Sequence, residues 1–142
     1  SGKSSTHEID EAIKLAFNES GKLAATAIAY KHPVFYPAIL NPLSSKRMKQ
    51  YLDEAKDWWR MSRKDPGWVE ESSQIDRLSE ISVPTLVIVG ELDIPEMEPA
   101  SDSIVQGVAN ARKVSMQGCG HMANMENPKT FNRIVLEFLS GT

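Results

Sequence analysis

The run from Thr85 to Val89, Thr-Leu-Val-Ile-Val, constrains the fold of this chain more than any other stretch. It is short, apolar and rich in β-branched residues, with Pro84 before it and Gly90 after it. Such a run does not alternate polar and apolar residues and is too short for a helix, so it predicts a strand buried on both faces. Strands of this kind occur mainly in parallel sheets covered by helices, and we therefore expect an α/β fold.

The composition is that of one soluble globular domain, with 142 residues, 41% of them hydrophobic and 25% charged. The net charge of -3 argues against the basic surface of a nucleic-acid-binding protein. No apolar run approaches the roughly 20 residues that span a bilayer, and the first residues lack the apolar core of a signal peptide. A single cysteine, Cys119, excludes an internal disulfide framework and favours a reducing compartment. We expect a cytoplasmic protein without nucleic-acid or membrane partners.

The first half of the chain has a helical pattern. Its apolar periodicity predicts helices over residues 5–20, 22–30 and 45–61, with a proline-rich loop over residues 32–42. The apolar residues expected to be buried are Ile9, Ala12, Ile13, Ala16 and Phe17 in the first helix, Leu23, Ala27 and Ile28 in the second, and Met48, Tyr51, Leu52, Ala55 and Trp59 in the third. A change of pattern near residues 67–72 divides the chain into a helical region, residues 1–70, and a second region, residues 71–142.

Residues 71–142 alternate between helices and strands. A short helix over residues 74–80 precedes the first strand, and a helix over 100–109, a strand over 112–116 and a helix over 129–139 follow it. Asn127 is a favoured N-cap for the last helix, and Pro128 suits its first position. The residues that this helix is expected to bury are Phe131, Ile134, Val135, Phe138 and Leu139. Two strands joined by a crossover helix predict a parallel βαβ unit.

Asp93 and His121 each follow one of the predicted strands. Parallel strands of one βαβ unit end at the same edge of the sheet, so the two residues are expected to be neighbours despite their distance in sequence. A carboxylate in that position can accept the N–H of the imidazole and fix its tautomer. The other ring nitrogen can then act as a general base near neutral pH, so we interpret the two as a catalytic pair.

The residues around this pair resemble the α/β-hydrolase fold family. Residues 81–93 look like the strand and loop that hold the catalytic acid of the family, and residues 118–128 look like the loop that holds its catalytic histidine. The helix over residues 131–139 is similar to the closing helix, and the helices of residues 5–61 are similar to the helical cap. The resemblance implies the C-terminal part of an α/β-hydrolase fold, a helical cap region followed by a two-strand parallel βαβα segment. It also implies that Asp93 is the acid and His121 the base of a catalytic triad.

The sequence departs from the family at the nucleophile. The family places its nucleophile before the acid and the histidine, on a Gly-x-Ser-x-Gly turn. No serine of this chain has glycines at both of those positions, and the first residue is Ser1 rather than Met. We expect a fragment or processed product of a serine-type hydrolase that cleaves an ester, thioester, amide or C–C bond in a small molecule. Alone, the chain is expected to be inactive, and the alternative is a catalytically inactive module that oligomerises.

The apolar strand over Thr85 to Val89 also suggests a partner. Two strands rarely form a stable sheet by themselves, and an unpaired apolar edge invites another strand. We therefore expect self-association or pairing with a complementary N-terminal hydrolase segment. No cofactor or metal is expected, because the 3 histidines lack metal-ligand spacing and the acidic loop lacks a glycine-centred calcium site. The acidic residues of that loop are Glu91, Asp93, Glu96 and Glu98.

Several of these residues also have plainer interpretations. Asp93 could cap the following helix, and His121 could be a structural histidine in a glycine-rich turn. Cys119 is interpreted as a small buried residue rather than a nucleophile. The candidate substrate-pocket residues, for which packing in the core is the alternative, are Met122, Met125 and Trp58.

Overall fold

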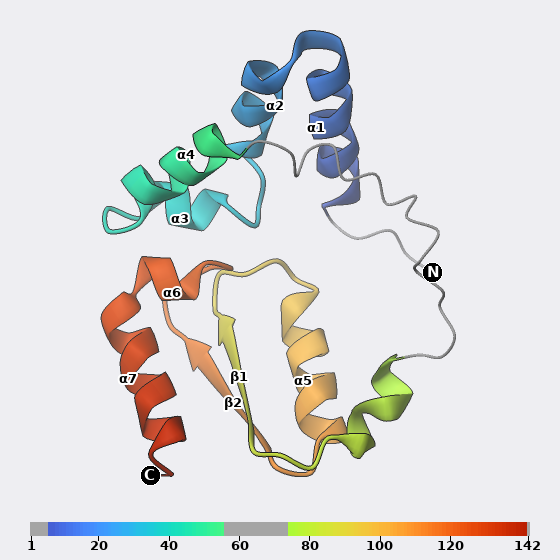
Figure 1. Cartoon of the computed structure of the whole chain (residues 1–142), viewed down its shortest axis with the longest axis vertical. Coiled ribbons are helices and arrows are strands. Elements are labelled where there is room, and N and C mark those ends of the chain that lie inside the picture. The colour runs from blue at the N-terminus through green and yellow to red at the C-terminus, as the bar shows by residue number, and fades with distance from the viewer. Residues whose placement is uncertain (1–5, 56–73, 142) are drawn as a thin grey trace.

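The computed structural model describes residues 6–55 and 74–141. Four helices form one group, and a two-stranded parallel sheet with its helices forms another (Figure 1). In chain order the elements are α1 (His7–Ser20), α2 (Lys22–Ala29), α3 (Tyr36–Leu40), α4 (Ser45–Glu54), the 3₁₀ helix η2 (Gln74–Glu80), β1 (Thr85–Gly90), α5 (Met97–Gly107), β2 (Ala111–Met116), α6 (Ala123–Glu126) and α7 (Pro128–Leu139). The α/β class and the two parallel strands are as predicted. The division between residues 1–70 and 71–142 stays a prediction, since it falls outside the described residues.

β1 and β2 pair along their whole length, from Thr85 opposite Ala111 to Gly90 opposite Met116. The last two residues of β1 are buried, whereas the first four are only half-buried. The prediction of a strand buried on both faces is therefore correct only at its carboxyl end. The physical reason is that β1 has one neighbouring strand, β2, within the part of the chain that the structure describes.

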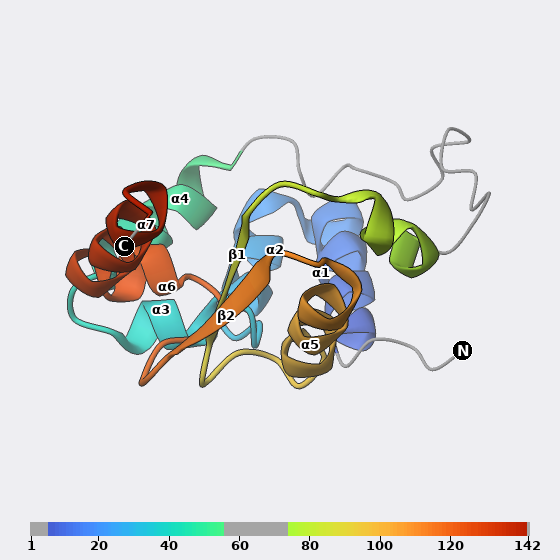
Figure 2. The same ribbon diagram turned by 90° about the horizontal axis from the view of Figure 1, so that it is seen from below.

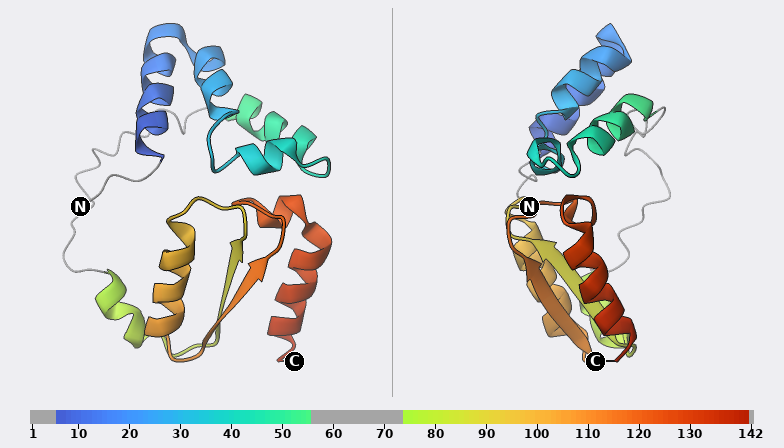
Figure 3. Two further views of the ribbon diagram at one scale, coloured as in Figure 1. Left: turned by 180° about the vertical axis from the view of Figure 1, so that it is seen from behind. Right: turned by 90° about the vertical axis from the view of Figure 1, so that its left-hand side faces the viewer.

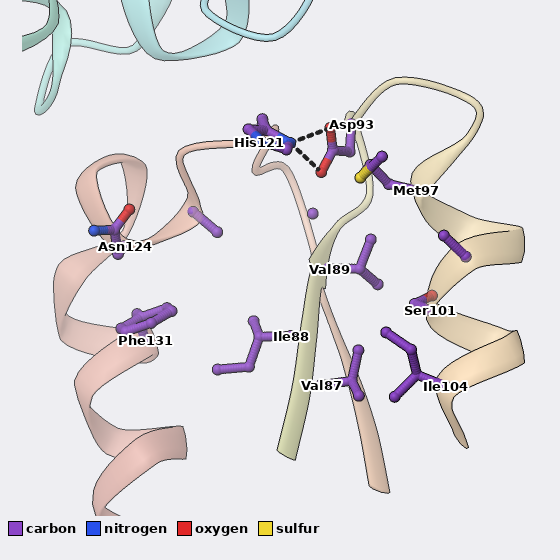
Figure 4. A pocket seen from close by; sticks show the side chains of 13 residues that line it. Val87, Ile88, Val89, Asp93, Met97, Ser101, Ile104, His121, Asn124 and Phe131 are labelled. Carbon is purple, nitrogen blue, oxygen red and sulfur yellow. Dashed lines mark hydrogen bonds and ion pairs between the residues drawn. The ribbon is translucent and has the colours of Figure 1, made fainter. Parts of the chain in front are cut away.

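Helices cover both faces of the sheet, α5 on one side and α7 on the other (Figures 2 and 3). Successive side chains of a strand point to opposite faces. Val87 and Val89 accordingly lie towards α5, whereas Ile88 lies towards Phe131 of α7 (Figure 4). The core on the α7 side is formed by the buried residues Met116, Cys119, Ala123 and Ile134, with Leu86, Ile88, Val114 and Phe131 packed against them.

The helices α1 to α4 lie beyond the carboxyl ends of β1 and β2 (Figures 1 and 3). They enclose a core of their own, whose buried residues are Ile13, Ala25, Ala29, Phe35, Ala38, Ile39, Met48 and Leu52. Two of the three residues predicted to be buried in α2 are not, since Leu23 is 86% exposed and Ala27 is exposed, whereas Ile28 is partly buried and packs against this core. α2 instead buries Ala25, Thr26 and Ala29, because small side chains let it pack closely against α1.

Other differences concern where helices begin and end. α4 ends at Glu54, earlier than predicted, because Ala55 has an extended ψ of 114°. The short helices α3 and α6 were not predicted, and Leu139 is 72% exposed at the end of α7 rather than buried. Asn127 caps α7 as predicted, since its side chain accepts a hydrogen bond from the backbone N–H of Thr130. No helix among the described residues is long and apolar enough to cross a membrane.

Candidate active site

Asp93 and His121 lie together beyond the carboxyl ends of the two strands (Figure 4). Nδ1 of His121 is 2.9 Å from Oδ1 and 3.1 Å from Oδ2 of Asp93. The Asp93 side chain is 9% exposed, whereas the imidazole is 36% exposed. The predicted proximity is therefore confirmed. Nε2 of His121 makes no hydrogen bond to any residue of 6–55 or 74–141, so this nitrogen is available to another group.

The loop after β1 places Asp93 through hydrogen bonds to its own turn and to the histidine loop. The N–H of Asp93 donates to the carbonyl of Gly90 at 3.2 Å, and the N–H of Leu92 donates to the carbonyl of Cys119 at 2.8 Å. Oδ1 of Asp93 also accepts the N–H of Ile94 at 2.7 Å. The N-cap of α5 is Glu96, so Asp93 does not cap that helix.

A second carboxylate, Glu126, holds the loop on which His121 stands. Its Oε2 accepts the N–H of Gly120 at 2.8 Å and its Oε1 accepts the N–H of Met122 at 3.1 Å. Glu126 is 2% exposed. Glu126 was not predicted from the sequence as a site residue, because the groups that it binds are backbone N–H groups whose directions depend on the path of the loop.

The other candidate residues near the pair have packing roles in the structure. Cys119 is 2% exposed, as predicted for a small buried residue, and burial followed by the charge of Glu126 raises the pKa of its thiol. Met122 and Met125 pack against the core of the helical group, and neither is among the residues that line the pocket beside the pair. Their assignment to a substrate pocket stays a prediction. Trp58 lies outside the described residues.

A pocket of about 320 Å³ follows the edge of β1, with Asp93 and His121 at one end (Figure 4). Its apolar lining comes from both faces of the strand, with Val87 on the α5 side and Ile88 and Phe131 on the α7 side. The pocket therefore wraps around the strand edge that β2 does not occupy. Among the residues described, no group of three or more His, Cys, Asp or Glu side chains could hold a metal ion.

Comparison with known proteins gives partial matches. No family model matches the sequence. The chain is 41% identical over 65 residues to a 2-hydroxy-6-oxononadienedioate/2-hydroxy-6-oxononatrienedioate hydrolase from Cupriavidus pinatubonensis, a match that covers 46% of this chain and 22% of that protein. It is 30% identical over 73 residues to a proline iminopeptidase from Thermoplasma volcanium, covering 51% of this chain and 24% of that protein.

Two solved structures share the fold over nearly the whole chain. MenH from S. aureus superposes with a TM-score of 0.65 at 20% identity, covering 96% of this chain and 52% of that chain. An N-acyl homoserine lactone degrading enzyme gives a TM-score of 0.62 at 22% identity, covering 92% of this chain and 53% of that chain. The chain therefore spans about half the length of these structures and about a quarter or less of the curated relatives.

Proposed function

We propose that this chain carries the acid and the base of a serine-type hydrolase. The premise is that the chain belongs to the α/β-hydrolase fold family and matches only part of the length of its relatives. In this proposal Asp93 accepts the Nδ1 proton of His121 and fixes the tautomer of the imidazole. Nε2 then accepts the proton of a serine that lies outside this sequence. The observation that supports the proposal is the contact of Nδ1 with both carboxylate oxygens, at 2.9 and 3.1 Å.

The reaction class follows from the roles of these groups. As His121 removes its proton, the serine oxygen attacks a carbonyl carbon of the substrate. The imidazolium, stabilised by Asp93, returns the proton to the leaving group. The named substrates of similar proteins include a dioate and an N-acyl homoserine lactone. We propose hydrolysis of an ester, thioester, amide or C–C bond next to a carbonyl in a small molecule.

One additional polypeptide segment could supply both the nucleophilic serine and a strand next to β1. Within residues 6–55 and 74–141, β1 pairs only with β2. Apolar side chains from both faces of β1 line the pocket. We propose that a strand of a complementary hydrolase segment occupies this edge and that the same segment supplies the serine. Self-association through this edge is the alternative. Size-exclusion chromatography with light scattering tests both, and a compact, well-folded monomer of this chain would count against them.

Turnover of p-nitrophenyl acetate by the natural gene product tests the catalytic assignment. His121→Ala and Asp93→Asn are each expected to lower kcat by about 10³-fold or more, because each removes one member of the triad. His7→Ala, a histidine replacement on α1, is the matched control and should leave kcat unchanged. Equal rates for His121→Ala and the unaltered protein would contradict the proposal.

A catalytically inactive module that oligomerises is the second candidate function. The observations that favour it are the edge of β1 that no strand within residues 6–55 or 74–141 occupies, and the absence of a Gly-x-Ser-x-Gly turn from the sequence. A fluorophosphonate probe, which labels activated serines, separates the two candidates when it is applied to the natural gene product. Labelling that depends on His121 supports the hydrolase, and association without any labelling supports the inactive module.

A further inference from the structure

Glu126 is a buried carboxylate at the end of α6, next to the candidate base. Only 2% of the residue is exposed. None of the ion pairs among the described residues involves it, so no cation within residues 6–55 or 74–141 pairs with its charge. Because a buried charge is costly unless it is well hydrogen-bonded, its hydrogen bonds must account for its place in the fold.

Those hydrogen bonds come from the residues on either side of His121. Gly120 donates its N–H to Oε2 at 2.8 Å, and Met122 donates its N–H to Oε1 at 3.1 Å. Hydrogen bonds from N–H groups to a carboxylate are stronger than those between neutral groups. One carboxylate group therefore holds the backbone before and after His121. It thereby sets the direction in which the His121 side chain points.

The imidazole itself is held more weakly. It is 36% exposed, and within the described part of the chain its hydrogen bonds all go to Asp93. Catalytic groups have to be held within about 0.5 Å of their productive position. Hydrogen bonds to the single residue Asp93 leave the ring free to move with its loop, so the backbone has to supply the remaining constraint.

We propose that Glu126 is the positioning residue of His121, holding the histidine loop so that Nδ1 meets Asp93 and Nε2 stays free. The positioning role concerns the structure of the pair, and its importance for turnover rests on the proposed hydrolase function. Glu126 acts through the backbone of Gly120 and Met122 and does not touch the reacting atoms.

The same residue joins the loop to the helical group. The carbonyl of Glu126 accepts a hydrogen bond from Nδ2 of Asn41, after α3, at 3.1 Å. Gly120 lies against α3 so closely that a β-carbon on it would be 2.6 Å from side-chain atoms of Pro37. The histidine loop is thus enclosed between Glu126 and α3, which limits the directions in which it can move.

Glu126→Gln tests the proposal with little change in side-chain size. The amide has one acceptor oxygen, and its NH₂ group faces the second backbone N–H, so only one of the two hydrogen bonds can remain. The measurement is NMR of the labelled protein, following amide exchange at Gly120 and Met122 and the Nδ1–H signal of His121. We expect exchange at one of these amides to accelerate by about tenfold or more, and the Nδ1–H signal to broaden or disappear.

Glu137→Gln, the same replacement on the exposed face of α7, is the matched control and should leave all three signals unchanged. Accelerated amide exchange with an unaltered Nδ1–H signal would mean that Glu126 only stabilises the loop, and would overturn the proposal. If Glu126→Gln does not fold, Glu126→Asp is judged by the same criterion, since it keeps both oxygens on a shorter side chain. None of these signals requires turnover, so an inactive protein would refute the hydrolase function without affecting this test.

Discussion

The backbone of Gly90 lies so close to Gly120 that a β-carbon on Gly90 would be 2.2 Å from the carbonyl oxygen of Gly120. The same β-carbon would be 2.4 Å from the carbonyl oxygen of Cys119. Both obstacles are backbone atoms, which cannot rotate away as a side chain can. Gly90 comes just before the loop of Asp93, and Gly120 comes directly before His121, so this close approach holds the two loops against each other.

Gly90→Ala is therefore expected to lower the free energy of unfolding by roughly 3 kcal/mol, the upper part of the usual range for overpacking. Urea unfolding at one fixed protein concentration measures the change. Gly141→Ala is the control, because Gly141 follows the end of α7 with a φ of 73° and has no neighbouring atom within 4 Å of the β-carbon position. This replacement should lower the free energy of unfolding by about 1 kcal/mol, which is the cost of placing an alanine in the left-handed conformation. Equal losses in the two variants would show that the loops can separate without strain.

The contrast between what could and could not be predicted from the sequence has a physical basis. The strands and the contact of Asp93 with His121 were predictable, because a short apolar run identifies a strand and parallel topology brings strand ends together. The buried face of α2 was not predictable, because close packing against α1 places the small residue Ala25 in the core and leaves Leu23 exposed. Glu126 was not either, because its partners are backbone groups positioned by a loop.

Asn127→Ala should destabilise the start of α7. Oδ1 of Asn127 accepts the N–H of Thr130 at 3.2 Å, and that N–H has no partner within the helix. Loss of such an N-cap costs about 1 kcal/mol, which chemical denaturation can detect. Asn132→Ala, at an exposed position within α7, is the control and should have little effect or stabilise slightly, since alanine favours helices. Similar losses for both variants would contradict a capping role.

Cys119 should be unreactive in the folded protein. Its side chain is buried and the pKa of its thiol is raised, by desolvation first and by the charge of Glu126 second, so little thiolate is present or accessible. Reaction with a disulfide reagent such as DTNB should be slow in buffer and fast in denaturant. The unfolded chain should release one equivalent of thionitrobenzoate, since it contains one cysteine. Rapid reaction in buffer would show that the histidine loop opens readily.

His32 is a buried histidine in the helical group, and 4% of the residue is exposed. Its Nδ1 accepts the N–H of Val34 at 3.2 Å, and its Nε2 is 3.3 Å from Oδ1 of Asp10. Burial lowers the pKa of His32 below its ordinary value, the charge of Asp10 opposes this shift, and the charge of His121 adds to it. A protonated Nδ1 could not accept the N–H of Val34, so this contact favours the neutral imidazole, as burial does.

This arrangement should make the protein less stable in mild acid. The pKa of His32 is lower in the folded chain than in the unfolded chain, so the unfolded chain binds the proton more readily. Its contribution to stability is therefore complete above the unfolded value of about 6.5 and decreases as the pH falls through that value towards the lowered folded pKa. His32→Asn removes the titration while its amide oxygen can still accept the N–H two residues on. The free energy of unfolding, measured by urea titration across this pH range, should fall less steeply for His32→Asn. His7 and His121 are present in both proteins, so parallel pH profiles would show that His32 does not contribute.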